Sequence, residues 1–202
     1  MTSSLRGLSP DATYELWIKP TALSANSSQT ILEVDNKRVT LEIQGSKVLA
    51  RWIDGVGGGQ TLEAYGVNND AWIHIGWQTS LNTKVTRTWA GRYISEIQNH
   101  AFGDYIFPTF ANFRIGNNER GDSSFIGWMR ELKIWNEFRS DLNLKRFVNL
   151  EVGTEYRANL AHYFKFAFDT EVLRIRDSQN SSGLFDFTRI NLKPNESPVR
   201  FR

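Results

Sequence analysis

The sequence contains no cysteine, and it holds only three histidines and five prolines among its 202 residues. Without cysteine the chain can form neither a disulfide framework nor a thiolate metal site. Export is not excluded, because a chain of this length can bury a core that folds without cross-links. The three histidines, His74, His100 and His162, have no Asp or Glu at a spacing typical of zinc ligands. A histidine-based catalytic or zinc site is therefore not supported.

Charge of one sign and long hydrophobic runs are also lacking. The net charge is +2, and the mildly basic segment 174–202 is diluted by Asp177, Asp186 and Glu196. A nucleic-acid site would need clustered basic residues beside stacking aromatics. No apolar run approaches the length of a membrane span, and no leader pattern follows Met1. We expect neither nucleic-acid binding nor membrane insertion, and the chain is either cytosolic or an excised piece of a longer protein.

Strand-like patterns fill the first two thirds of the chain. "TYELWIKP" at 13–20 alternates Tyr14, Leu16 and Ile18 with polar residues, as a half-buried strand does. "TILEV", "RVTLEI" and "KVLARWI" follow, and "DNK" and "QGS" between them have the composition of hairpin turns. This rhythm predicts an antiparallel meander.

The segment "SFIGWMRELKIWNEFRS", residues 124–140, fits a helix by one spacing and a strand by another. Gly127 and the β-branched and aromatic residues favour the strand, over Phe125 to about Trp135. On such a strand Trp128 and Trp135 have opposite parity, so they face different sides of the sheet unless a bulge intervenes. Ser140 is typical of a helix N-cap, and a short helix near 140–148 is predicted after it.

The number of strand-like runs predicts the architecture. About twelve short strands and one short helix indicate an all-β fold, a two-sheet antiparallel jelly-roll sandwich. We expect a single domain over residues 1–202, with its core at about 10–190 and a tail or linker at 191–202. The opening "MTSSLRG" resembles a start placed before a domain boundary.

Four fragments in this order resemble the laminin G-like, concanavalin A-like lectin/glucanase jelly rolls. "ATYELWIKP" is similar to their "FTVEAWVKP" strand, and "AWIHIGW" to their "W-x-H-V-A" strand, with His74 at the position of their strand histidine. "FRIGNNERGDSSFIGWMRELKIWNEFRS" resembles their closing segment, and "NLAHYFKFAFDTEVLRIRDSQNSSG" resembles their opening strand although it comes late here. The resemblance implies a register-shifted jelly roll, but a fold does not specify a ligand.

Many jelly-roll relatives hydrolyse glycans, a reaction that needs paired carboxylates. Retaining enzymes place two carboxylates about 5 Å apart. "EVDNKR" at 33–38 carries Glu33 and Asp35 but has Arg38 where the laminarinase-type strand has its second Glu, and "DNK" is typical of a turn. The chain is therefore not expected to be an enzyme, and no catalytic residue is proposed.

A candidate metal site lies in the polar loop before residue 124. Asn117, Glu119 and Asp122, with Asn118 and Ser123, offer the oxygen ligands that calcium prefers. The resemblance implies a rim loop that contributes calcium ligands in some relatives, although Ile75 stands where those relatives have an acidic residue. A solvated hairpin loop is the alternative interpretation.

Aromatic and polar residues on the strands predict a ligand-binding face. A flat ring can cover the apolar face of a pyranose while nearby polar groups bond its hydroxyls. Trp52, Trp89, Tyr93 and Arg92 are the candidates, with packing in the core as the alternative for each ring.

Together these patterns favour a non-catalytic binding module of a larger extracellular or cell-surface protein, which recognises a glycan or a protein in adhesion. Three Asn-X-Ser triplets, at Asn26, Asn180 and Asn195, agree with export from a eukaryotic cell. The alternatives are a structural module that packs against sister modules and, from the resemblance, a glycan hydrolase.

Overall fold

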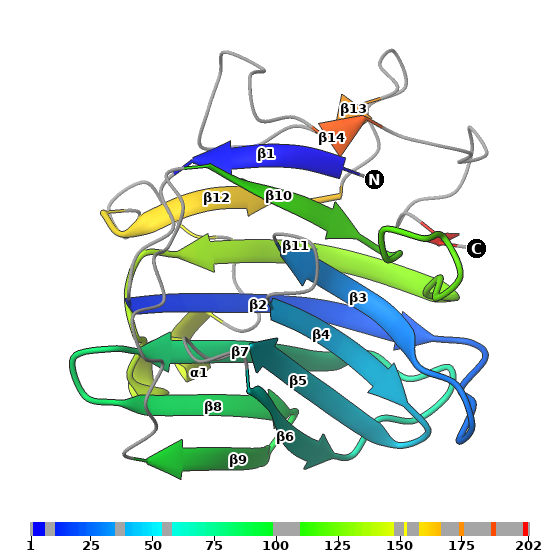
Figure 1. Cartoon of the computed structure of the whole chain (residues 1–202), viewed down its shortest axis with the longest axis horizontal. Coiled ribbons are helices and arrows are strands. Elements are labelled where there is room, and N and C mark those ends of the chain that lie inside the picture. The colour runs from blue at the N-terminus through cyan, green and yellow to red at the C-terminus, as the bar shows by residue number, and fades with distance from the viewer. Residues whose placement is uncertain are drawn as a thin grey trace.

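The computed structural model describes residues 2–6, 11–34, 39–53, 58–98, 110–147, 152, 158–166, 174–175, 187–188 and 200–201. Two antiparallel sheets pack face to face, with strand orders β1-β10-β3-β4-β5-β6 and β12-β11-β2-β7-β8-β9 (Figure 1). The first sheet consists of β1 (Thr2–Arg6), β10 (Phe110–Ile115), β3 (Gln29–Val34), β4 (Val39–Gln44), β5 (Lys47–Ile53) and β6 (Gly59–Tyr65). The second consists of β12 (Leu160–Phe164), β11 (Gly127–Trp135), β2 (Asp11–Pro20), β7 (Ile73–Ser80), β8 (Val85–Ala90) and β9 (Tyr93–Gln98).

The predicted fold class is confirmed, since the described residues form a two-sheet antiparallel sandwich. β12 closes the second sheet against β11, so the late strand does join the sandwich. Strand pairing also reaches both ends of the chain, because β1 pairs with β10 and β15 (Arg200–Phe201) pairs with β11. A small separate sheet joins β13 (Arg174–Ile175) to β14 (Phe187–Thr188).

β2 shows how the alternation builds the core. Tyr14, Leu16 and Ile18 all point between the sheets and are buried in one hydrophobic cluster. The Tyr14 ring stacks on Trp77 of β7, with 5.4 Å between the ring centroids. We call the sheet surfaces that point away from this core the outer faces.

A bulge in β11 settles how its two tryptophans lie. Arg130 pairs with Trp17 of β2, whereas Lys133 pairs with Glu15, so two β11 residues stand opposite one β2 residue. Glu131, within the bulge, has a φ of 58°, in the left-handed region. The extra residue restores parity, which puts Trp128 and Trp135 on the same outer face. The sequence pattern predicted opposite faces unless a bulge intervenes, and the structure contains that bulge.

The predicted short helix is α1 (Asp141–Phe147), and Ser140 caps it as expected. The Asn143 backbone N–H donates to the Ser140 Oγ at 3.3 Å, and that of Leu144 donates to the Ser140 carbonyl at 2.9 Å. Leu142, on α1, is 75% exposed. Among the described residues, no helix is long and apolar enough to span a membrane.

Candidate functional site

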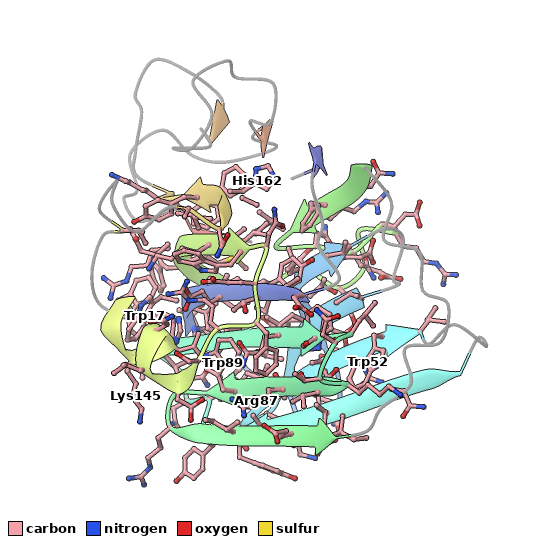
Figure 2. All side chains as sticks on the ribbon, turned by 90° about the vertical axis from the view of Figure 1, so that its left-hand side faces the viewer. Trp17, Trp52, Arg87, Trp89, Lys145 and His162 are labelled. Carbon is pink, nitrogen blue, oxygen red and sulfur yellow. The ribbon has the colours of Figure 1, made fainter. Side chains whose placement is uncertain are left out.

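A groove of about 450 Å³ lies between α1 and the outer face of the second sheet, and we call it the helix groove. Strands β2, β7 and β8 contribute its aromatic side chains, and the β8–β9 turn and α1 contribute charged ones. Figure 2 shows Trp17, Trp89 and Lys145 gathered around α1, with Trp52 farther away, toward the first sheet. The groove is therefore assembled from segments far apart in the sequence.

Three aromatic side chains form the floor of the helix groove. Trp17 and His74 are direct cross-strand partners on β2 and β7, with 5.5 Å between their ring centroids. Trp89 pairs with Gly76, and its ring lies 5.9 Å from that of His74. A β-carbon at Gly76 would lie 2.2 Å from Cζ2 of Trp89, so the indole covers the glycine directly. Only the absence of a side chain at Gly76 lets this ring lie flat on the sheet.

Polar contacts fix the orientation of the floor. The Trp89 Nε1–H donates to Nδ1 of His74 at 3.1 Å. Because an indole N–H can only donate, Nδ1 acts as the acceptor, and Nε2 is the nitrogen that faces β2. That nitrogen lies 3.1 Å from Oε2 of Glu15, whose other oxygen accepts from the Trp135 Nε1–H at 2.8 Å. A continuous chain of polar groups thus joins the floor to the strand beyond β2.

The carboxylate in this chain is completely buried. Burial alone raises the pKa of Glu15, but the hydrogen bond to His74, the positive charge of Lys133 and the bond from Trp135 outweigh it, so the pKa lies below its ordinary value. Lys133 is itself only 1% exposed, and burial lowers its pKa. The outer face of the second sheet therefore holds a buried charged pair, Glu15 and Lys133.

The segment that leads into α1 is tied to the same face. The Thr13 Oγ1–H donates to the carbonyl of Glu137 at 2.7 Å, and the guanidinium of Arg139 lies 3.6 Å from the centroid of the Trp135 ring. The Arg139 NH2 group also donates to the carbonyl of Asn143 in α1 at 3.3 Å. These contacts hold α1 against the sheet as one side of the groove.

Charged side chains line the rim. Arg92 comes from the β8–β9 turn, and Lys145 and Asp141 come from α1. Asp141 accepts from NH1 of Arg87 at 2.9 Å, and Arg87 also pairs with Glu96. Arg92 donates to the Tyr93 hydroxyl at 3.2 Å.

Beside the helix groove, aromatic rings and cations alternate along the outer face. The guanidinium of Arg130 lies 5.2 Å from the centroid of the Trp17 ring and 4.6 Å from that of Trp72. The ammonium of Lys19 lies 5.1 Å from the centroid of the Trp128 ring. Since Trp17 belongs to both sets, this row extends the groove along the sheet.

The structure brings two of the four predicted ligand residues together. Trp89 and Arg92 both line the helix groove. Tyr93 does not line it, because it pairs with Ala90, a core residue, and therefore points toward the other face of the sheet. A β-carbon at Gly66 would lie only 2.8 Å from Cδ2 of the Tyr93 ring.

Trp52, the remaining predicted ligand residue, does not line the helix groove. It is 2% exposed and belongs to the core cluster between the sheets. With Arg51, Ile53, Thr40, Glu42 and Gln60 it lines a second groove of about 480 Å³ at the first sheet. The strand parity of "KVLARWI" was the signal that separates the two faces.

Sequence reasoning missed Trp17, Lys145 and the role of His74. Trp17 has the parity of Glu15 and Lys19, which marks it as an outward residue of β2. His74 was interpreted as a structural histidine, and it does hold Trp89 and face Glu15 in the floor. Lys145 could be found only after the placement of α1 was known.

Of the carboxylates in "EVDNKR", Glu33 alone lies in the described part of the chain. Glu33 is fully buried, and its Oε1 accepts from Arg114 at 2.9 Å. Asp35 and Arg38, with the "DNK" turn, lie outside the described residues.

The polar loop at 117–122 satisfies its own side chains. Oδ1 of Asn117 accepts from the Asn118 N–H at 2.8 Å, and Glu119 lies 3.4 Å from Arg114. Asp122 accepts from the Asn118 side chain at 2.5 Å. Nowhere in the described part of the chain do three or more His, Cys, Asp or Glu side chains come close enough to hold a metal ion.

Calcium binding at this loop stays a prediction from the sequence. On that prediction, calcium raises the midpoint of thermal unfolding relative to chelator, because a ligand that binds only the folded state stabilises it. Asp122→Asn should remove the shift, whereas Asp141→Asn, on α1, should retain it. Equal midpoints with calcium and with chelator would contradict the prediction.

The comparisons with known proteins agree with this architecture. A family model of laminin G type, from the Concanavalin A-like lectin/glucanases superfamily, matches residues 2–144. The chain belongs to this superfamily. The predicted resemblance is thereby confirmed. No curated protein matches the sequence.

Solved structures with the same fold share little sequence with this superfamily member. A protein from Bacteroides ovatus to which carbohydrate binding is ascribed has 19% identity and a TM-score of 0.67, over 92% of this chain and 54% of that one. The CBM40 of the Ruminococcus gnavus IT-sialidase, bound to α2,3-sialyllactose, has 17% identity and a TM-score of 0.58, over 71% of this chain and 84% of that one. A SAP-like pentraxin from Limulus polyphemus has 14% identity and a TM-score of 0.51, over 68% of this chain and 67% of that one. The chain spans about half the length of the Bacteroides protein.

Proposed function

We propose that this chain is a non-catalytic saccharide-binding module whose ligand lies in the helix groove. The observation that carries the proposal is the rigid aromatic floor of Trp17, His74 and Trp89 beside a charged rim. A flat ring covers the apolar face of a sugar, and polar groups around it bond the hydroxyls. Such a module would serve a longer extracellular or cell-surface protein in adhesion.

Trp17 is the ring on which we expect the sugar to stack. Trp89 and His74 are nearly covered, whereas Trp17 keeps part of its surface open and lines the groove. The guanidinium of its neighbour Arg130 lies over the same ring, 5.2 Å from the centroid. Fixed aromatic rings lose little entropy when they bind, which favours recognition by a preformed site.

The relatives support a saccharide as the ligand class. The sialidase module from Ruminococcus gnavus was solved with α2,3-sialyllactose and with α2,6-sialyllactose. Asn26, in one of the three Asn-X-Ser triplets, is exposed, which agrees with an extracellular setting; the other two lie outside the described residues.

Trp17→Ala is expected to remove glycan binding from the 202-residue chain. Loss of a stacking ring in a carbohydrate site typically costs about 1–3 kcal/mol of binding free energy, by analogy with base–aromatic stacking, or about tenfold to hundredfold in affinity. The measurement is retention on an immobilised glycan array, followed by calorimetric titration of the bound glycans.

Tyr65→Ala is the matched control, because Tyr65 is a 51% exposed ring on β6 of the other sheet. It should leave binding unchanged. A wild-type chain that retains no glycan, but self-associates, would instead support a structural module that packs against sister modules. Turnover of a polysaccharide by the purified chain would overturn the non-catalytic proposal.

A further inference from the structure

Resting on the proposed function, we propose that the helix groove selects an acidic saccharide, whose carboxylate or sulfate is held by Arg92 and Lys145. The charge of the rim carries this inference, because the aromatic floor alone does not distinguish acidic from neutral sugars. Arg92 and Lys145 line the groove from two elements, the β8–β9 turn and α1.

The acidic side chain of the groove is already paired with a cation. The Asp141 carboxylate lies 2.9 Å from NH1 of Arg87, which also pairs with Glu96 of β9. Arg87 thus shares its single positive charge between these two carboxylates. Asp141 therefore leaves the groove without a strong acceptor for the two remaining cations.

In the described part of the chain, the two cations of the rim have no carboxylate partner. Among the described residues, no carboxylate lies within 4.0 Å of Arg92 or Lys145, and the Arg92 guanidinium donates only to the uncharged Tyr93 hydroxyl. Cations that line a concave site concentrate anions in it, because its low-dielectric sides focus the field. A bound anion would supply the missing counter-charge.

The rest of the groove suits a sugar that carries this anion. Leu144 and Ile94 line it together with Trp17, so apolar surface stands beside the charged rim. A monosaccharide ring against Trp17 leaves its substituents to reach the rim. The planar guanidinium of Arg92 can bond two oxygens of one carboxylate or sulfate, and Lys145 adds a point charge.

Uronates, sialates and sulfate esters share this anionic chemistry, so the test uses all three. Calorimetric titration would compare tetragalacturonic acid with its methyl ester, 3′-sialyllactose with lactose, and a sulfated galactotetraose with the unsulfated form. At least one acid is expected to bind about tenfold or more tightly than its neutral partner, since a hydrogen bond to a charged group contributes about 1.5–3 kcal/mol. The pair that shows this difference in affinity identifies whether the groove prefers a uronate, a sialate or a sulfate ester.

Arg92→Gln and Lys145→Gln should each lower the affinity for that acid about tenfold, and both together should abolish the preference. Arg92→Lys should keep part of it, because the charge is retained. Arg51→Gln is the matched control, since Arg51 is an exposed cation in the second groove. Added salt should lower the affinity for the acidic saccharide and leave the affinity for its neutral partner unchanged.

Three results separate the two proposals. Equal affinity for acid and neutral forms, with loss in Trp17→Ala, overturns the acidic preference and leaves the saccharide module standing. Loss of acid binding in Arg51→Gln but not in Arg92→Gln overturns the assignment to the helix groove. Failure to retain any glycan on the array overturns both proposals.

Discussion

Gly76→Ala is expected to lower the free energy of unfolding by about 3 kcal/mol, the upper range for overpacking a core position. The new β-carbon would lie 2.2 Å from Cζ2 of Trp89 and 2.4 Å from the carbonyl oxygen of Tyr14. The second of these is backbone of the paired strand β2, so a side-chain rotation cannot relieve it. Denaturation in urea, followed by tryptophan fluorescence, measures the loss.

The same substitution should weaken glycan binding in whatever protein remains folded. Trp89 would have to lift off the sheet, and its bond to His74 would be lost with it. Gly59→Ala is the matched control, because Gly59 lies on β6 with open space around its β-carbon position. Equal unfolding midpoints for the two variants would contradict the close approach of Trp89 to β7.

The fold could be predicted because its information is local. Alternation in "TYELWIKP" marks which side chains of β2 enter the core, and the residues buried in the cluster are those of that parity. The cap at Ser140 needs only a side chain and the next turn, so it too was visible in sequence. Both patterns depend on neighbours a few residues apart.

The bulge at Glu131 could not be located from parity alone. A pattern with two apolar parities fits either a helix or a strand with one extra residue, and the sequence permits both. The pairing of β11 with β2 shows that the strand with one extra residue is correct. Arg130 pairs with Trp17 and Lys133 pairs with Glu15, so β11 has one more residue than β2 between these two pairs. Its physical effect is large, since one inserted residue moves every later side chain to the opposite face.

The candidate site was predicted in part for the same reason. Trp89 and Arg92 were found because ring and cation lie near one turn, whereas Trp52, on β5, lines a second groove away from them. Lys145 was invisible, since it reaches the groove only through the contacts that dock α1 on the sheet. Polar parity on β2 also suggested solvent, whereas Glu15 is wholly covered. When a segment distant in sequence covers the outer face of a sheet, the sequence pattern of the covered strand does not show it.

Glu15→Gln is expected to destabilise the protein by about 3 kcal/mol at pH 7, the lower end of the cost of breaking a buried charged pair. The carboxylate accepts from Trp135 and faces His74, and it lies in the field of the buried Lys133. An amide keeps one acceptor oxygen but turns donors toward groups that also donate, and it removes the charge that compensates Lys133. Urea denaturation at several pH values measures the difference from the wild type.

The sign of the pH dependence follows from the lowered pKa of Glu15. A carboxylate with a folded-state pKa below its ordinary value of 4.5 contributes stability above that value and loses the contribution as the pH falls through the folded-state pKa. The gap between wild type and Glu15→Gln should therefore be full at pH 7 and narrow below about pH 4. Glu119→Gln, at an exposed pair with Arg114, should differ from wild type by less than about 0.5 kcal/mol throughout. If the difference in free energy of unfolding between wild type and Glu15→Gln stays constant down to pH 3, Glu15 stabilises the protein through its shape alone. Its charge would then contribute nothing to the floor of the helix groove.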